Sequence, residues 1–191
     1  MSARFVPPLG ALVLACVLAA CGGSDSTGAF NPAGRPQTPT ASSPGAGEPA
    51  AADAPPRTLT VQQINGQVLA RYRAYQRAYE KAYETNDPSG LGTYVMDPLL
   101  GIVSADLREL AAKGEIWRFH NVLNPRIQGR SETGATVFVI DCVRTLAAYR
   151  YSAKTGRRLG AFRGGARAYQ AVLRYIDGTW KISNATEGQK C

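Results

Sequence analysis

Two side chains in the second half of the sequence could take part in acid–base chemistry. His120 is the only histidine, and Asp141 lies within a run of apolar residues. A general acid or base needs such a group, with a pKa tuned by its surroundings and a partner to orient it. Strand alternation sets His120 opposite Trp117 and Phe119. If those two rings face the helices, His120 faces solvent.

The same alternation sets Asp141 opposite Phe138, Ile140 and Cys142, so we expect the carboxylate to point away from an interior pocket. The sequence has no Ser/His/Asp set, no glycine-rich phosphate loop and no metal-ligand spacing. We therefore assign no catalytic residue, metal site or cofactor. The sequence favours a protein that is not an enzyme.

Tyrosines recur at a spacing that places them on one side of a helix. Ala-Tyr occurs at 74–75, 78–79 and 82–83, and Tyr72 lies beside them. The simpler interpretation is that the rings pack on a sheet with their hydroxyls at its rim. The alternative is an amphipathic pocket wall for a ring-bearing or lipid-like ligand. Its candidate lining residues are Tyr75, Tyr79, Trp117 and Tyr169.

Basic residues concentrate in one segment. The chain has 22 Lys and Arg against 14 Asp and Glu, and no acidic residue occurs between Asp141 and Asp177. A field of this kind attracts anionic surfaces and accelerates encounters with them. A solvated basic face with no ligand remains the alternative. The candidate anion-binding residues are Arg150, Arg157, Arg158, Arg163 and Arg167.

Two helices are expected in front of these strands. Thr60 and Gln63 form a capping-box pattern, and an amphipathic helix follows to about Thr85. A second helical region runs from about Asp97 to Lys113, where apolar residues recur at helical spacing.

Residues rich in β-branched and aromatic side chains then predict about four strands, over 116–127, 136–145, 166–176 and 179–185. Asp177-Gly178 predicts a tight hairpin between the last two strands, and Thr155-Gly156 predicts a smaller hairpin between Tyr149 and Phe162. Helices followed by antiparallel strands indicate an α+β domain over 59–191, with the helices on one face of a curved sheet.

The N-terminus predicts export. Residues 1–20 have a basic start, a short apolar run and small residues at the end, as a signal peptide does. Leu18-Ala19-Ala20-Cys21 resembles the bacterial lipobox, which implies a diacylglyceryl anchor on Cys21, with further acylation of the palmitate type. Residues 21–58 are rich in Pro, Gly and Ala and are expected to be a disordered tether. The predicted location is the outer face of the cytoplasmic membrane.

Cys142 and Cys191 are the cysteines that remain in the expected domain. An even pair in an oxidising compartment most simply forms a disulfide. Metal binding is the weaker interpretation, because the sequence has no CxxC and one histidine.

The order of elements, with Asp141-Cys142, Gly178-Thr179-Trp180-Lys181-Ile182 and Cys191, resembles the NTF2-like (cystatin-like cone) superfamily, small secreted actinobacterial members in particular. The resemblance covers residues 59–191. It implies a pocket between the long helix and the concave sheet, which some members use as isomerases, dehydratases or cyclases and many use only for binding or assembly.

Together these observations predict an envelope lipoprotein that binds a partner protein, an anionic polymer or a lipid headgroup through the 144–174 region, and not nucleic acid. The alternative is a small-molecule or lipid-like ligand binder, or a SnoaL-like isomerase or dehydratase, that uses the cone pocket.

Overall fold

The computed structural model describes residues 54, 55 and 57–191. The expected signal peptide, the lipid-anchored Cys21 and most of the expected tether lie outside the described residues. Helix α1 (Val61–Thr85) begins at the predicted capping box. The Thr60 hydroxyl accepts a hydrogen bond from the Gln63 amide at 3.2 Å, and the Gln63 side chain accepts one from the Thr60 amide at 2.8 Å. The helix ends at Asn86 in the left-handed conformation.

A short 3-10 turn, η1 (Leu91–Thr93), leads to the second helix, α2 (Leu99–Ala112). The remaining chain forms the antiparallel strands β1 (Glu115–Val122), β2 (Arg126–Arg130), β3 (Thr136–Ser152), β4 (Arg158–Ile176) and β5 (Thr179–Lys190). The sheet order is β1-β3-β4-β5, and β2 pairs with β3 beyond the end of β1.

The expected strand over 116–127 is two strands. β1 pairs with the second half of β3 and β2 with its first half, and Asn124-Pro125 lies between them. Proline cannot donate to a ladder, so it falls at the break. The sheet therefore has five strands in place of about four.

The strands expected over 136–145 and 166–176 are longer than predicted. They continue as one long hairpin, β3–β4, which turns at the predicted Thr155-Gly156, where Gly156 has φ 67°. The predicted turn at Asp177-Gly178 also closes its hairpin, with φ 51° and 74°. Both φ values are positive, as in the two-residue turns that match strand twist.

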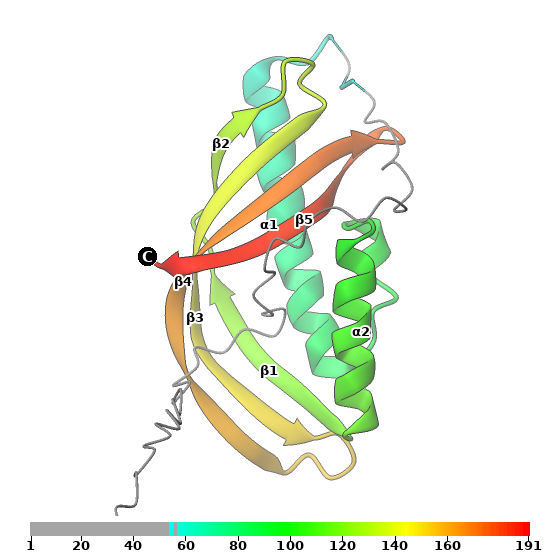
Figure 1. Cartoon of the computed structure of the whole chain (residues 1–191), viewed down its shortest axis with the longest axis vertical. Helices are drawn as coiled ribbons and strands as arrows, with labels where there is room; N and C mark the ends of the chain where they lie inside the picture. The colour runs from blue at the N-terminus through cyan, green and yellow to red at the C-terminus, as the bar shows by residue number, and fades with distance from the viewer. Residues whose placement is uncertain (1–53, 56) are drawn as a thin grey trace, which may run out of the picture.

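The long β3–β4 hairpin is curved (Figure 1), and Gly164 lies within its β4 strand. A Cβ atom at this position would overlap the carbonyl oxygens of Thr145 and Leu146 on β3. The backbones of β3 and β4 approach each other there more closely than any side chain allows, so only glycine fits. The curved hairpin forms part of the concave face of the sheet (Figure 1).

Both helices lie on that concave face (Figure 1). The core fills the space between them, with large side chains that are almost completely buried. Its members include Val68, Tyr72, Tyr75, Val103, Leu107, Val137, Leu173 and Ile182. Burial of this apolar surface is the main stabilising contribution to such a domain.

Candidate functional site

The tyrosine stripe of α1 is part of the core. Tyr75 has no exposed surface, and Tyr79 is 5% exposed. The centroid of the Tyr79 ring lies 4.7 Å from that of Tyr83 and 5.9 Å from that of Phe119 on β1. Edge contacts between rings stabilise a core beyond the area they bury. These rings pack between α1 and the sheet, as in the simpler of the two interpretations of the stripe. That interpretation also placed the hydroxyls at the rim, which is wrong for Tyr75, whose hydroxyl is buried.

The other two pocket candidates lie at partly buried positions against the same core. Trp117 packs on Phe162 of β4, with ring centroids 4.8 Å apart. Burial raises the pKa of Tyr169 to about 12, and the nearby Tyr75 side chain opposes that shift. The two tyrosines therefore lie close enough to influence each other, although the Tyr75 hydroxyl has no hydrogen-bond partner among the described residues. The role of these four aromatic residues in lining a ligand pocket stays a prediction.

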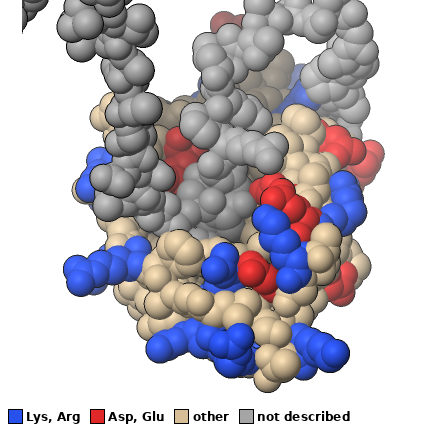
Figure 2. Space-filling view, turned by 60° about the horizontal axis from the view of Figure 1, so that its bottom comes forward, with Lys and Arg blue, Asp and Glu red and all other residues tan. Residues whose placement is uncertain are grey.

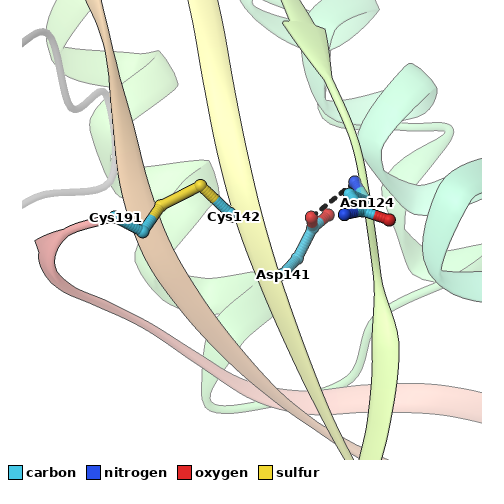
Figure 3. Close-up of a disulfide and its surroundings, with 4 residues drawn as sticks. All are labelled: Asn124, Asp141, Cys142 and Cys191. Atoms are coloured by element: carbon cyan, nitrogen blue, oxygen red, sulfur yellow. Dashed lines mark hydrogen bonds between the residues drawn. A yellow bond between two sulfur atoms is a disulfide. The ribbon is translucent and has the colours of Figure 1, made fainter.

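Asp141 faces the interior, and the expectation that it points away from the inside of the sheet is wrong. Its exposed fraction is 1%, whereas Phe138 is 41% exposed. The backbone amide of Asn124 donates a hydrogen bond to Asp141 Oδ1 at 2.7 Å (Figure 3). The alternation was assigned correctly, but the inner set of β3 contains Val137, Val139 and Asp141, and Phe138 belongs to the outer set.

Burial is the main influence on this carboxyl group and raises its pKa. The Asn124 amide, the Tyr72 hydroxyl and the Arg73 charge lower the pKa and oppose burial in part. Tyr72 is itself buried, and desolvation, followed by the Asp141 charge, raises the pKa of its hydroxyl far above 10. Asp141 on β3 and Tyr72 on α1 therefore lie close enough to influence each other's ionisation.

Asp141 begins a polar row that crosses the inner face of the sheet. Tyr169 on β4 lies directly opposite Asp141, and Glu187 on β5 lies directly opposite Tyr169. Burial raises the pKa of Glu187, and Arg167, whose Nε lies 3.4 Å from Glu187 Oε1, lowers it. The row could donate to and accept from a polar ligand at a partly buried place. Side-chain alternation along β3 and β5 could have assigned Asp141 and Glu187 to one face of their strands. Only the register between the strands shows that the three residues are neighbours.

His120 lies outside this row. Its side chain is 70% exposed, and Nδ1 lies 3.2 Å from Glu80 Oε2 on α1. The other carboxylate oxygen of Glu80, Oε1, accepts a hydrogen bond from the backbone amide of Asn121 at 2.8 Å. A β-bulge between Phe119 and Asn121 brings this part of β1 to the helix. Glu80 thus joins the end of β1 to α1, and His120 contributes to that contact.

The basic segment divides into paired and exposed residues. Arg150 lies 3.5 Å from Glu115, and Arg167 pairs with Glu187, so two of the five candidates have acidic partners. Arg157, Arg158 and Arg163 are exposed. Within residues 57–191 none of these three forms an ion pair. Figure 2 shows basic side chains along the lower rim of the end that comes forward, which is the hairpin end of Figure 1.

A groove of about 680 Å³ opens on another side of α1, next to the β4–β5 hairpin. Its lining includes Arg71, Tyr94, Tyr175 and Trp180. Arg71 Nε donates to the Trp180 carbonyl at 2.7 Å, and its guanidinium lies 5.1 Å from the Tyr94 ring centroid. None of the four pocket candidates lines this groove. The sequence analysis did not single out Arg71, because one cationic residue on a helix face carries no distinctive pattern.

Cys142 and Cys191 form a disulfide, with an S–S distance of 2.12 Å and a Cα–Cα distance of 5.9 Å. The bond crosses β4 and ties the end of β5 to β3 (Figure 3). Among the described residues there is no cluster of three His, Cys, Asp or Glu that could hold a metal ion. No helix in the part of the chain that the structure describes is long and apolar enough to span a membrane.

Comparison with solved structures identifies the fold. The chain is similar to the intermembrane space region of the chloroplast protein ARC6, with a TM-score of 0.52 and 12% identity over 69% of this chain and 98% of that one. Similarity at a TM-score of 0.44 extends to a putative scytalone dehydratase from Novosphingobium aromaticivorans, with 15% identity over 69% of this chain and 94% of that one. A putative NTF2-like dehydratase from Streptomyces avermitilis is similar at a TM-score of 0.42, with 17% identity over 68% of this chain and 99% of that one.

No protein-family model and no curated protein matches the sequence. The α+β architecture that the sequence predicted is confirmed, with a long helix and a shorter one on a curved antiparallel sheet. Structures described as NTF2-like or cystatin-like are similar at TM-scores of 0.42 and 0.40. These likenesses concern the fold alone, so function is argued from the residues.

Proposed function

We propose that the protein is an exported lipoprotein, anchored through Cys21, whose domain binds an anionic component of the cell envelope without catalysing a reaction. The observation that carries this proposal is the exposed basic surface of the outer part of the β3–β4 hairpin. Arg157 and Arg158 are exposed beside its turn, and Arg163 is exposed further along β4, in a segment without acidic residues. Such a surface attracts polyanions and raises the rate of encounter with them.

The contacts of the two candidate acid–base residues support binding over catalysis. His120 is exposed and lies against Glu80. Asp141 is buried, and one of its oxygens accepts the Asn124 amide. Both side chains have contacts that connect elements of the fold, as expected of structural polar residues.

A second candidate is favoured by the row Asp141, Tyr169 and Glu187. These residues could bind a small polar ligand inside the sheet, or serve a SnoaL-like isomerase or dehydratase reaction. Two carboxyl groups with raised pKa values beside a tyrosine are suited to proton transfer. Turnover of a cyclic hydroxyketone that is abolished in Asp141→Asn and Glu187→Gln would favour this candidate.

Charge reversal tests the leading proposal. The mature chain carrying Arg157→Glu, Arg158→Glu and Arg163→Glu is compared with wild type for binding to purified envelope fractions. Each basic residue near an anionic surface contributes about 1 kcal/mol, so three should lower affinity roughly 100-fold. A matched control with Arg108→Glu, Arg126→Glu and Lys190→Glu has the same net charge and should bind normally.

Equal loss in both triple variants would mean that net charge alone drives binding, and no loss in either would refute the proposal. Cys21→Ala tests the anchor separately. The protein should then lose labelling by radioactive palmitate and appear in the medium or the soluble envelope fraction. Membrane retention of the unlabelled Cys21→Ala protein would contradict anchoring through this residue.

A further inference from the structure

Two arginines and two tyrosines interleave on the outer face of the sheet at its hairpin end. Arg118 on β1 lies directly opposite Tyr149 on β3. Tyr151, two residues further along β3, lies directly opposite Arg158 on β4. Residues directly opposite each other in a ladder project from the same face, as do residues two apart on a strand. The four residues form a patch across three adjacent strands, called here the Arg–Tyr patch.

Each guanidinium stacks diagonally on the tyrosine of the other pair. The Arg118 guanidinium lies 4.9 Å from the centroid of the Tyr151 ring, and that of Arg158 lies 5.7 Å from the centroid of the Tyr149 ring. A guanidinium stacked on a ring keeps its edge N–H groups available for carboxylate or phosphate oxygens. The stacking therefore orients two anion-binding groups on rigid strands.

The spacing of the patch suits a ligand with repeated charges. Arg118 and Arg158 belong to the strands on either side of β3, and neighbouring strands are about 4.8 Å apart, so these two strands are about 10 Å apart. The two arginines are also offset by two residues along β3. Tyr149 and Tyr151 lie between them and are partly exposed. The arrangement places aromatic surface between two cationic groups, which fits sugar rings between anionic substituents.

The composition of the hairpin tip favours a polymer as the ligand and not a bilayer surface. Residues 153–157 read Ala-Lys-Thr-Gly-Arg and contain no large apolar side chain. Elements that lie in a membrane interface insert Trp, Phe or Leu between the lipids, in addition to their electrostatic attraction. The tip has the charge for an anionic surface but not the apolar residues that would insert into it.

We propose that the Arg–Tyr patch binds an anionic polysaccharide, with Arg118 and Arg158 contacting its acidic groups and the two tyrosine rings contacting its sugar rings. This inference rests on the proposed binding function and names the chemical class of its ligand. Glu84 on α1 is the acidic residue paired with the patch, because its Oε1 lies 3.6 Å from Arg118 Nε. It should weaken binding of polyanions, and Glu84→Gln should strengthen it.

The test uses the full mature chain and three probes, namely a polyuronate, inorganic polyphosphate, and vesicles of phosphatidylglycerol. Arg118→Gln with Arg158→Gln should weaken polyuronate binding at least about tenfold. Tyr149→Leu with Tyr151→Leu keeps every charge and removes the rings. It should weaken polyuronate binding roughly tenfold and leave polyphosphate binding within about twofold of wild type. Arg108→Gln with Arg126→Gln is the control, and circular dichroism verifies folding of each variant.

Three outcomes would overturn the inference. Equal loss of polyuronate and polyphosphate binding in the tyrosine variant would mean that the rings only hold the arginines. Preference for the vesicles over both polymers would assign the surface to lipid. No effect of either pair of substitutions would place polyanion binding elsewhere. If the triple charge reversal still removes envelope binding in that last case, the proposed function stands and only the inference about the Arg–Tyr patch fails.

Discussion

Asp141 shows how far side-chain alternation can be taken on a strand. Residues 137–143 read Val-Phe-Val-Ile-Asp-Cys-Val, so both faces of this part of β3 are apolar apart from one residue. Alternation divides such a run into two sets but does not say which set is buried. Either Phe138 or the valines could form the buried set. In the structure the valines are buried in the packing against α1, and Phe138 is exposed.

The buried carboxylate of Asp141 should make stability depend on pH. Its folded-state pKa is raised above the ordinary value of 3.8, chiefly by burial. The folded state therefore binds the proton more tightly, and stability is lost as pH rises from 3.8 through the folded-state pKa. The Asp141→Asn variant has no carboxyl group at this position, so its stability should not fall in this way as pH rises. Its free energy of unfolding, from urea titrations at several pH values, should exceed that of wild type at pH 7 and approach it at low pH.

Asp141→Leu is the contrasting variant. It removes the acceptor of the Asn124 amide, at 2.7 Å in the wild type, and should destabilise the domain by about 1–2 kcal/mol. If Asp141→Asn is the less stable protein at pH 7, then the neighbours of the carboxylate outweigh its burial, and the expected sign is wrong.

At the scale of elements, local signals predicted the turns and caps better than the lengths of the strands. Thr60 with Gln63, Asp177-Gly178 and Thr155-Gly156 all occur where the sequence placed them. The extent of the β3–β4 hairpin was missed because the residues between Leu146 and Ser152 include alanines and an arginine, which carry a weak strand signal alone. Pairing with β1 on one side and β4 on the other makes this stretch a strand.

Gly164 in that hairpin gives a sharp test of backbone proximity. Gly164→Ala places a Cβ against the carbonyl oxygens of Thr145 and Leu146, and backbone atoms cannot move aside cheaply. We expect a loss of about 2 kcal/mol or more in the free energy of unfolding. Gly165→Ala, one residue further, meets nothing within 4 Å and serves as the control. Equal melting temperatures for the two variants would show that the strands separate easily at Gly164.

At the scale of the whole molecule, the disulfide joins residues 49 positions apart and fixes the end of β5 across β4. In the chain-entropy model, closing a loop of that length stabilises the fold by about 4 kcal/mol. Cys142→Ser with Cys191→Ser should lower the free energy of unfolding by roughly that amount. Thiol titration of the denatured, unreduced wild type should find neither cysteine reactive. Two reactive thiols, or an unchanged midpoint in the double variant, would contradict this prediction.

The sequence predicted the fold class and the disulfide because each depends on patterns that are local or on a small number of cysteines. The polar row of Asp141, Tyr169 and Glu187 and the Arg–Tyr patch could not be predicted in that way. Both depend on the register between strands that are far apart in the chain, and bulges such as the one beside Phe119 shift that register.

The long axis of the molecule gives it two unlike poles. Helix α1 starts at one pole, and the turn of the β3–β4 hairpin lies at the other (Figure 1). Under the proposed attachment through Cys21, the chain from the membrane reaches the domain at the pole of α1. The basic pole is then the end of the domain farthest from the attachment point. A ligand bound at that end would not have to displace the segment that joins the domain to its anchor.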